Sequence, residues 1–245
     1  MNNSRPKIFA MIPARYGSSR LRLKNLALIN QKPLISYAIN AAKGTDIFEK
    51  IILNSDHLIF SDIAKRHGID FYKRPEDLGS SESKSDSVVA DFINHFTDAE
   101  IVVWVNSIAP LQTSEDIENA VAYFLDENLD SLITVEEKFV HCNFKKEPVN
   151  YSKNEMFLQT QLLEPIHPFI YSIMMWRTKK FMDDFKRYGY ALFCGKFDTY
   201  PVNKERSIII KDKSDLLLAD TLMKISAGDM DYEVQYDQTV MKFLK

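Results

Sequence analysis

Residues 7–26, KIFAMIPARYGSSRLRLKNL, consist of an apolar run followed by a basic loop. Residues 8–12 are uniformly apolar, which is typical of a strand buried on both faces, and Pro13 is expected to end this strand. Four cations then lie around a single glycine: Arg15, Arg20, Arg22 and Lys24. Because like charges this close repel one another, a bound polyanion would relieve the repulsion, and a solvated basic turn is the alternative.

The position of this basic loop favours an anion site. In open α/β sheets, ligands bind at the carboxyl ends of strands, where backbone N–H groups, hydroxyl side chains such as Ser18 and Ser19, and fixed cations hold phosphates. The loop has one glycine and no GxxxxGK[ST] pattern, so neither the Walker A motif nor the dinucleotide fingerprint fits. The sequence therefore predicts a phosphate loop of another type.

The composition limits the functions open to the whole chain. Its 245 residues are 45% apolar and 27% charged, with a net charge of −3, which argues against a general nucleic-acid or membrane-surface binder. No run approaches the ~20 apolar residues of a membrane span, and the start, MNNSRPKIF, has no apolar signal core, so we expect a cytoplasmic protein. The two cysteines, Cys142 and Cys194, have no spacing typical of a disulfide framework or a zinc site.

Apolar patterns along the chain alternate between strands and helices. Strands are expected at 50–56, 69–72, 101–105, 132–135 and 168–177, with helices between most of them. This alternation implies a parallel sheet, so we predict a three-layer, Rossmann-like, mostly parallel α/β fold in one domain over residues 1–245. The alternation weakens within about 138–170, where we expect a projecting, β-rich arm.

Two further features of the pattern concern individual side chains. Thr113 and Asp116 are spaced as a capping box at the start of a helix. In the late strand, four residues are interpreted as core rather than as sugar-stacking groups: Tyr171, Met174, Met175 and Trp176.

The basic loop resembles the PAR-x-GS-x(5)-KN signature of the cytidylyltransferases that activate sialic acids and related keto-sugar acids, and its middle, YGSSRL, is similar to the loop of CMP-KDO synthetases. The residues in register are Pro13, Ala14, Arg15, Gly17, Ser18, Lys24 and Asn25. The resemblance implies that Arg15 and Lys24 bind the triphosphate of CTP and take part in catalysis. It also implies that Ala14, Gly17, Ser18 and Asn25 belong to the nucleotide site.

The activity implied by this resemblance is transfer of CMP from CTP to a sialic acid-like or KDO-like keto-sugar acid, with release of pyrophosphate. The implied cofactor is Mg²⁺, and the implied assembly is a homodimer formed through the arm. Two later segments also resemble the family. Residues 73–87, KRPEDLGSSESKSDS, resemble a loop near the nucleotide, which suggests base or ribose contacts by Arg74, Ser83 and Ser85; a solvated loop is the alternative. Residues 106–117, NSIAPLQTSEDI, resemble a segment of the sugar pocket and suggest Asn106 as a sugar contact.

The sequence departs from the family at the metal site. CMP-sialate synthetases carry a D-I-D triplet that binds magnesium after an Arg-Ser pair, whereas this chain has Ile209, Ile210 and Lys211 there. An aliphatic side chain cannot bind Mg²⁺, and an ammonium repels it. Three accounts stay open: Asp212 and Asp215 bind the metal and are catalytic, Lys211 supplies the missing positive charge, or the chain is a catalytically silent binding homologue.

The acceptor site departs as well. Where the family has an Arg that pairs with the substrate carboxylate, this chain offers Gln159 and Gln161 as substrate contacts. A neutral amide lacks the charge-assisted, bidentate bonding of Arg, so a nucleotidyltransferase with a different acceptor is a further alternative. Glu164 and His167 are the acid–base candidates nearby.

Overall fold

The computed structural model describes residues 5–226 and 236–237. A sheet of seven strands forms the centre of this part of the chain. The strands are β1 (Ile8–Ala14), β4 (Lys50–Ser55), β5 (Asp70–Lys73), β6 (Ile101–Val105), β7 (Ser131–Val135), β10 (Phe169–Arg177) and β11 (Phe197–Pro201). Their order is β11-β7-β10-β6-β1-β4-β5, and of these seven only β10 is antiparallel to its neighbours. The predicted mostly parallel, Rossmann-like sheet is confirmed.

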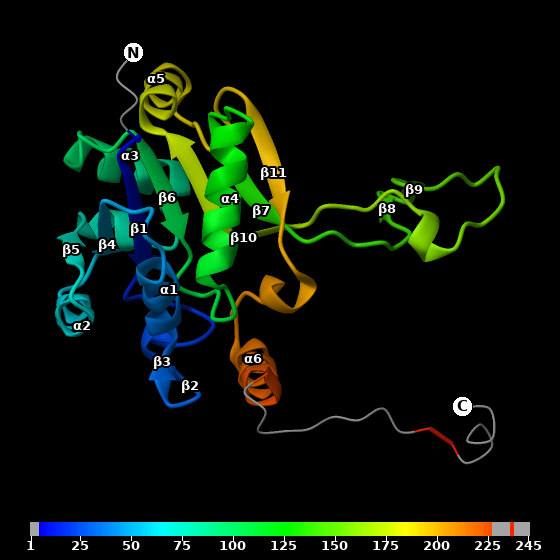
Figure 1. The fold of residues 1–245 in the computed structure, drawn as a ribbon, viewed down its shortest axis with the longest axis horizontal. Coiled ribbons are helices and arrows are strands. Elements are labelled where there is room, and N and C mark those ends of the chain that lie inside the picture. Colours follow the sequence, from blue (N-terminus) through cyan, green and yellow to red (C-terminus); the bar gives the residue numbers. More distant parts are fainter. Residues whose placement is uncertain (1–4, 227–235, 238–245) are drawn as a thin grey trace.

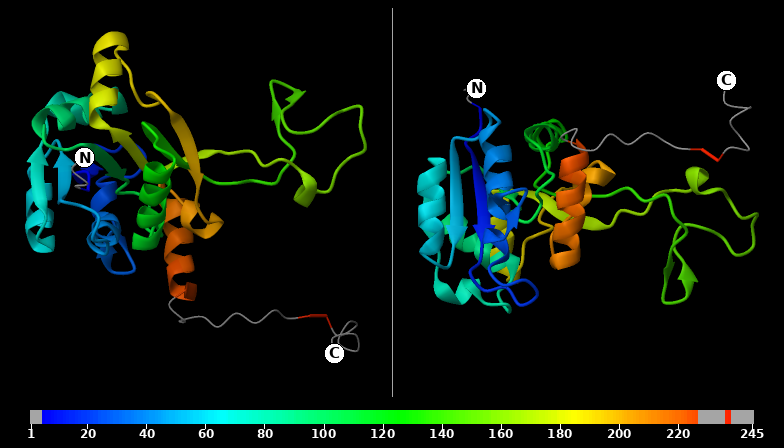
Figure 2. Two further views of the ribbon diagram at one scale, coloured as in Figure 1. Left: turned by 45° about the horizontal axis from the view of Figure 1, so that its top comes forward. Right: turned by 90° about the horizontal axis from the view of Figure 1, so that it is seen from below.

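Helices cover both faces of this sheet (Figures 1 and 2). They are α1 (Leu34–Lys43), α2 (Ile59–His67), α3 (Ser85–His95), α4 (Ser114–Asp126) and α5 (Thr178–Tyr188). A further helix, α6 (Lys213–Ser226), covers neither face and packs against Ile29, Leu34 and Ile210. Side chains of α1, α2 and α4 pack in the core on one face, and those of α3 and α5 pack on the other, which gives the three predicted layers. Among the described helices, none has both the length and the apolar character that crossing a bilayer requires.

Several short elements connect these layers. The basic loop leads through a 3₁₀ turn, η1 (Lys24–Leu26), into a small hairpin of β2 (Leu28–Ile29) and β3 (Lys32–Pro33). Further 3₁₀ turns are η2 (Glu76–Gly79), η3 (Thr160–Leu162) and η4 (Lys204–Ser207). At the start of α4, the predicted capping box is confirmed, since Thr113 and Asp116 each accept the backbone N–H of the other.

The first strand is buried along its whole length. Ile8, Ala10 and Ile12 face one core layer, and Phe9 and Met11 face the other, as expected for an uninterrupted apolar strand. The expectation that the strand ends at the proline was wrong, because β1 continues to Ala14 in parallel register with β4. A proline lacks only the N–H donor, and its fixed φ is compatible with extended backbone at the end of a strand.

The late strand β10 corrects another prediction. Met174, Met175 and Trp176 are buried in the core, as expected. Tyr171 is 46% exposed and has a φ of 57°, so its interpretation as a core residue was wrong. The register of β10 against β7 shifts between Phe169 and Met174, and an irregularity of this kind turns a side chain away from the face that strict alternation predicts.

Residues 136–168 leave the sheet between β7 and β10 as a projecting arm (Figure 1), here called the arm. The described arm contains little β structure, unlike the β-rich arm expected from the sequence. Its regular pairing is a hairpin of β8 (Asn143–Phe144) and β9 (Glu147–Pro148), with one bridge between Lys138 and Ile166 at the base. Longer strands need a run of alternating residues that pack against a second layer, and the arm has no such layer within this part of the chain.

Candidate functional site

The carboxyl ends of β1, β4 and β6 meet at one edge of the sheet. The basic loop follows β1, Asp56 follows β4, and Asn106 follows β6. A cavity of about 290 Å³ opens at this edge and is here called the basic cavity. It brings together seven of the residues that the sequence predicted as a site: Arg15, Lys24, Asn25, Arg74, Ser83, Ser85 and Asn106. Segments far apart in the chain therefore converge where ligands of α/β sheets bind.

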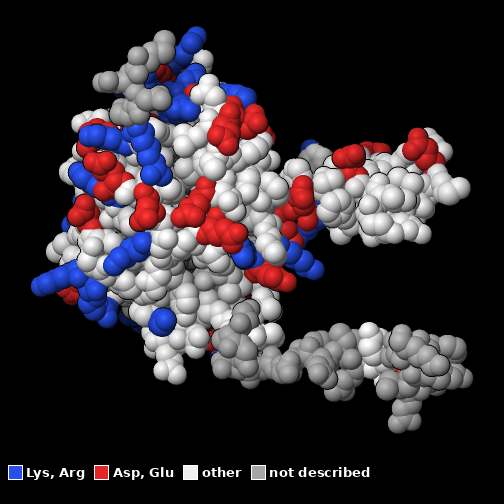
Figure 3. Space-filling model, in the orientation of Figure 1, with Lys and Arg blue, Asp and Glu red and all other residues white. Residues whose placement is uncertain are grey.

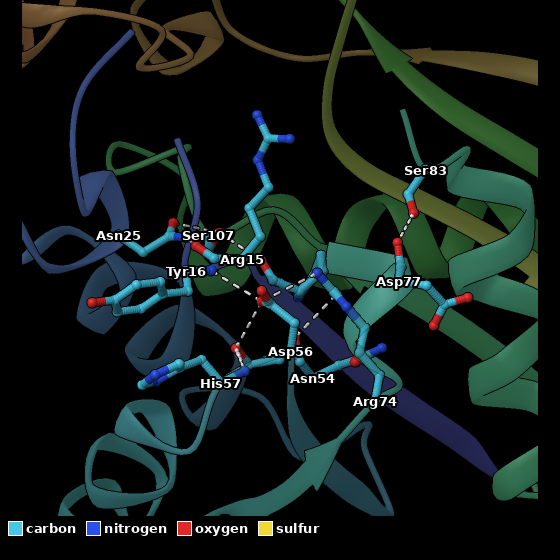
Figure 4. A network of polar contacts seen from close by, with 12 residues as sticks. Arg15, Tyr16, Asn25, Asn54, Asp56, His57, Arg74, Asp77, Ser83 and Ser107 are labelled. Atoms are coloured by element: carbon cyan, nitrogen blue, oxygen red, sulfur yellow. Dashed lines mark hydrogen bonds and ion pairs between the residues drawn. The ribbon is translucent and has the colours of Figure 1, made fainter. Parts of the chain in front are cut away.

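Two buried polar side chains hold the basic loop against the end of β6. Asn25 donates from Nδ2 to the carbonyl oxygen of Arg15 at 3.4 Å. The Ser107 hydroxyl lies 2.7 Å from the carbonyl oxygen of Pro13 and 2.9 Å from Asn25 Oδ1 (Figure 4). Asn25, predicted as a nucleotide contact, thus has its amide occupied in shaping the loop.

Asp56 joins the basic loop to the segment that follows β5. Its Oδ1 accepts the backbone N–H of Tyr16 at 3.0 Å and lies 3.8 Å from Arg74 Nη2 (Figure 4). Arg74 is only 4% exposed, and its Nη1 donates to the carbonyl oxygen of Asn54 at 3.3 Å. The neighbouring loop also packs on Asp56, because a Cβ at Gly79 would collide with the Asp56 carboxylate.

Two buried donors at the basic cavity have no hydrogen-bond partner among the described residues. They are Nε of Arg74 and Nε1 of Trp104. A buried donor without a partner costs free energy, so a polar ligand in this cavity would be stabilised by them. The first turn of α3 lies beside them, with Ser85 and Val88 lining the cavity, and the positive end of a helix dipole also favours an anion.

The cations of the basic loop are poorly neutralised. Arg15, Arg20 and Lys24 all line the basic cavity, and Lys24 Nζ donates to the carbonyl oxygen of Ile210 at 2.9 Å. Burial, followed by repulsion from Arg20 and Arg15, lowers the pKa of Lys24 to about 8, and only Asp215 acts against this. An anion bound beside Lys24 would stabilise its protonated form and so raise its pKa again.

Other predicted site residues lie outside the basic cavity. Ala14 is buried in the core at the end of β1, while Gly17 and Ser18 belong to the loop but do not line the cavity. Gln159 and Gln161 are exposed on the arm, and Glu164 and His167 line a separate cavity within the arm. The roles of these residues in binding stay predictions.

The two carboxylates predicted to bind magnesium cap the start of α6. Asp215 Oδ2 accepts the backbone N–H groups of Lys211 and Asp212 at 2.7 and 3.1 Å. In return, Asp212 Oδ1 accepts those of Ser214 and Asp215 at 2.9 and 3.2 Å. Neither carboxylate lines the basic cavity, and no cluster of three or more His, Cys, Asp or Glu side chains able to hold a metal ion occurs in the described residues. Because neither carboxylate lines the basic cavity and each has one oxygen engaged by backbone N–H groups, neither is placed to hold Mg²⁺ on a phosphate inside that cavity.

Three residues of this site were not predicted from the sequence: Asp56, Trp104 and Ser107. Asp56 could have been found, since a carboxylate directly after a parallel strand is the usual place for a site residue. Arg20 was seen as part of the basic cluster, but its place in the cavity depends on the path of the loop. Trp104 lies within a continuous apolar run, and Ser107 within an irregular turn, so neither carried a signal of which way it faces.

Comparisons with known proteins agree with this geometry. A family model described as "Cytidylyltransferase" matches residues 9–209. The N-acylneuraminate cytidylyltransferase of Escherichia coli O18:K1:H7 is 30% identical over 232 residues, which are 90% of this chain and 53% of that protein. The CMP-N,N'-diacetyllegionaminic acid synthase of Legionella pneumophila is 33% identical over 120 residues, covering 47% of this chain and 52% of that protein. The chain thus spans about half the length of these curated relatives.

Solved structures share the fold. A CMP:2-keto-3-deoxy-manno-octonic acid synthetase complexed with CTP superposes with a TM-score of 0.67 at 16% identity, covering 91% of this chain and 100% of that one. A 4-diphosphocytidyl-2C-methyl-D-erythritol synthase from Anaerococcus prevotii gives a TM-score of 0.64 at 11% identity, covering 90% and 100%. At such low identity the likeness concerns the fold alone.

Proposed function

The chain belongs to the cytidylyltransferase family, and from this premise we propose that it transfers CMP from CTP to a keto-sugar acid and releases pyrophosphate. The observation that carries the proposal is the basic cavity, in which three poorly neutralised cations, Arg15, Arg20 and Lys24, lie where a polyphosphate would bind. The family match supplies the nucleotide, and the names of the relatives supply the class of acceptor.

In this proposal the triphosphate lies along the basic loop. Arg15 and Lys24 bind its phosphates by charge-assisted hydrogen bonds, which stabilise a complex by about 1.5–3 kcal/mol each. In Figure 4 the side chain of Arg15 extends away from Asp56, so its guanidinium is not consumed by that carboxylate. The nucleoside would then extend toward Arg74, Ser83 and Ser85. Its acceptor atoms would bond the two buried donors without a partner there, Arg74 Nε and Trp104 Nε1.

The acceptor would enter beside Asn106, at the end of β6. The Asn106 amide is held in place, because its Nδ2 donates to the carbonyl oxygen of Tyr171 at 2.8 Å and its Oδ1 accepts the N–H of Ile108 at 3.3 Å. In the reaction, an acceptor hydroxyl oxygen forms a bond to the α-phosphorus of CTP and its proton passes to water, while the bond from that phosphorus to the pyrophosphate oxygen breaks. Cations around the β- and γ-phosphates stabilise the negative charge of the leaving pyrophosphate.

We also propose a homodimer formed through the arm. The arm exposes a set of large apolar side chains: Phe139, Val140, Phe144, Val149, Met156, Phe157, Leu158 and Leu162. On the face seen in Figure 3, much of the arm surface carries neither Lys or Arg nor Asp or Glu. An apolar surface of this extent is typical of an interface.

Turnover tests the proposed function directly. CTP is incubated with a panel of eight- and nine-carbon keto-sugar acids, and pyrophosphate release and the CMP-linked product are measured. We expect product with CTP and one class of acceptor, and no product with ATP or GTP. CTP binding without turnover of any acceptor on the panel would contradict the proposed acceptor class and leave the two alternatives, a catalytically silent homologue or a nucleotidyltransferase with a different acceptor.

A further inference from the structure

The segment that carries metal-binding aspartates in CMP-sialate synthetases is fastened to the edge of the basic cavity in this protein. The N–H of Ile210 donates to the carbonyl oxygen of Ile108 at 2.9 Å, and Ile108 lines the basic cavity. Lys24 Nζ bonds the carbonyl oxygen of the same Ile210 at 2.9 Å. The side chain of Ile210 is fully buried and packs against Ala219 of α6. The backbone of this segment is therefore in place, while its side chains offer no oxygen ligand.

The charge next to this segment is positive. Lys211 lines the opening beside the basic cavity, together with Tyr171 and Asp215. The positive charge of Lys211 lies close enough to Lys24 to lower the pKa of Lys24. Arg15 and Arg20 have the same effect. The nearest carboxylates, Asp212 and Asp215, each have one oxygen committed to two backbone N–H groups at the start of α6.

We propose that Arg15, Arg20, Lys24 and Lys211 together neutralise the triphosphate of CTP, so that nucleotide binding requires no metal ion held by the protein. This inference rests on the proposed function, because it concerns the same nucleotide. Ammonium and guanidinium groups act here through the same Coulomb attraction that a divalent cation supplies in a carboxylate site. Mg²⁺ competes with them for the same phosphate oxygens, so metal-free CTP binds at least as tightly as Mg-CTP.

The substitution Lys211→Asp tests this inference by restoring a carboxylate at the last position of the triplet. CTP is titrated into wild type and variant by calorimetry, once in excess EDTA and once in excess MgCl₂. For the wild type we expect equal or tighter binding in EDTA. For Lys211→Asp we expect about tenfold weaker binding in EDTA and recovery in MgCl₂, since the new carboxylate repels bare phosphate and can bind the metal.

Lys213→Asp is the matched control, because it makes the same change of charge on an exposed lysine that lines neither opening. It should leave both affinities unchanged. A severalfold gain of wild-type affinity on adding Mg²⁺ would overturn the inference, and loss of that gain in Asp212→Asn would assign the metal to the α6 carboxylates. Absence of CTP binding in both buffers would overturn the proposed function as well, so the two failures are distinguishable.

Discussion

The basic loop and the arm are both excursions from the central sheet, but they are held in opposite ways. The loop is fixed to β4 and β6 by Asp56, Asn25 and Ser107. Three of its four cations line the basic cavity. The arm is joined to the body by β7, β10 and a single bridge at its base, and its apolar side chains are exposed. This contrast supports both proposals, since a loop held in place by hydrogen bonds is preorganised for a ligand, and exposed apolar side chains are typical of an interface.

Substitution of Asp56 is expected to have the largest effect, because it would release the basic loop from β4. Asp56→Ala removes the carboxylate beside the buried Arg74 guanidinium and the acceptor of the Tyr16 N–H. Leaving a buried charge without its partner costs about 3 kcal/mol, so the free energy of unfolding in urea should fall by about that amount. Asp56→Asn keeps an acceptor for Tyr16 and should lose less. Equal unfolding curves for Asp56→Ala and wild type would show that Asp56 does not hold the loop.

A smaller effect is expected from pH. The pKa of Lys24 is lowered to about 8, so in the free protein this lysine loses its proton as the pH rises through that value. Only the protonated lysine attracts phosphate, and binding must then include uptake of a proton. CTP affinity should therefore fall about tenfold between pH 7 and pH 9.

Lys24→Arg is the control for this pH dependence, since an arginine keeps its charge throughout the range. Its CTP affinity, measured by the same titration, should be nearly constant between the two pH values. A wild-type affinity that does not change up to pH 9 would contradict the role of Lys24, and so would an equal fall in the arginine variant.

The smallest effect on the nucleotide site is expected from the arm. Met156 is 88% exposed and Phe157 is 77% exposed, so Met156→Ser with Phe157→Ser removes little packing within one chain. CTP affinity should stay within about twofold of wild type, because surface substitutions far from a site change free energies by about 0.5 kcal/mol or less. Light scattering should show the dimer shifting toward monomer. An unchanged mass would place the subunit interface elsewhere, or show that there is none.

The correctly predicted parts of the site are those in which a charged residue directly follows a predicted strand. Arg15 and Lys24 follow a buried strand, so their place at its carboxyl end was predictable from the parallel alternation. The roles of Asn25 and Asp215 were less accessible, because both use their side chains on backbone groups that only the folded loops bring close. Tyr171 was misplaced since an irregularity in β10 interrupts the two-residue period on which the prediction rests.

The substitution Lys24→Ala tests whether the basic loop binds the triphosphate of CTP. CTP is titrated by calorimetry into wild type, Lys24→Ala and the exposed control Lys32→Ala at pH 7, with thermal unfolding confirming that all three are folded. We predict one saturable site in the wild type and the control, and at least tenfold weaker binding in Lys24→Ala, equivalent to about 1.4 kcal/mol or more. Equal CTP affinity in Lys24→Ala and wild type would show that the basic loop does not bind the triphosphate.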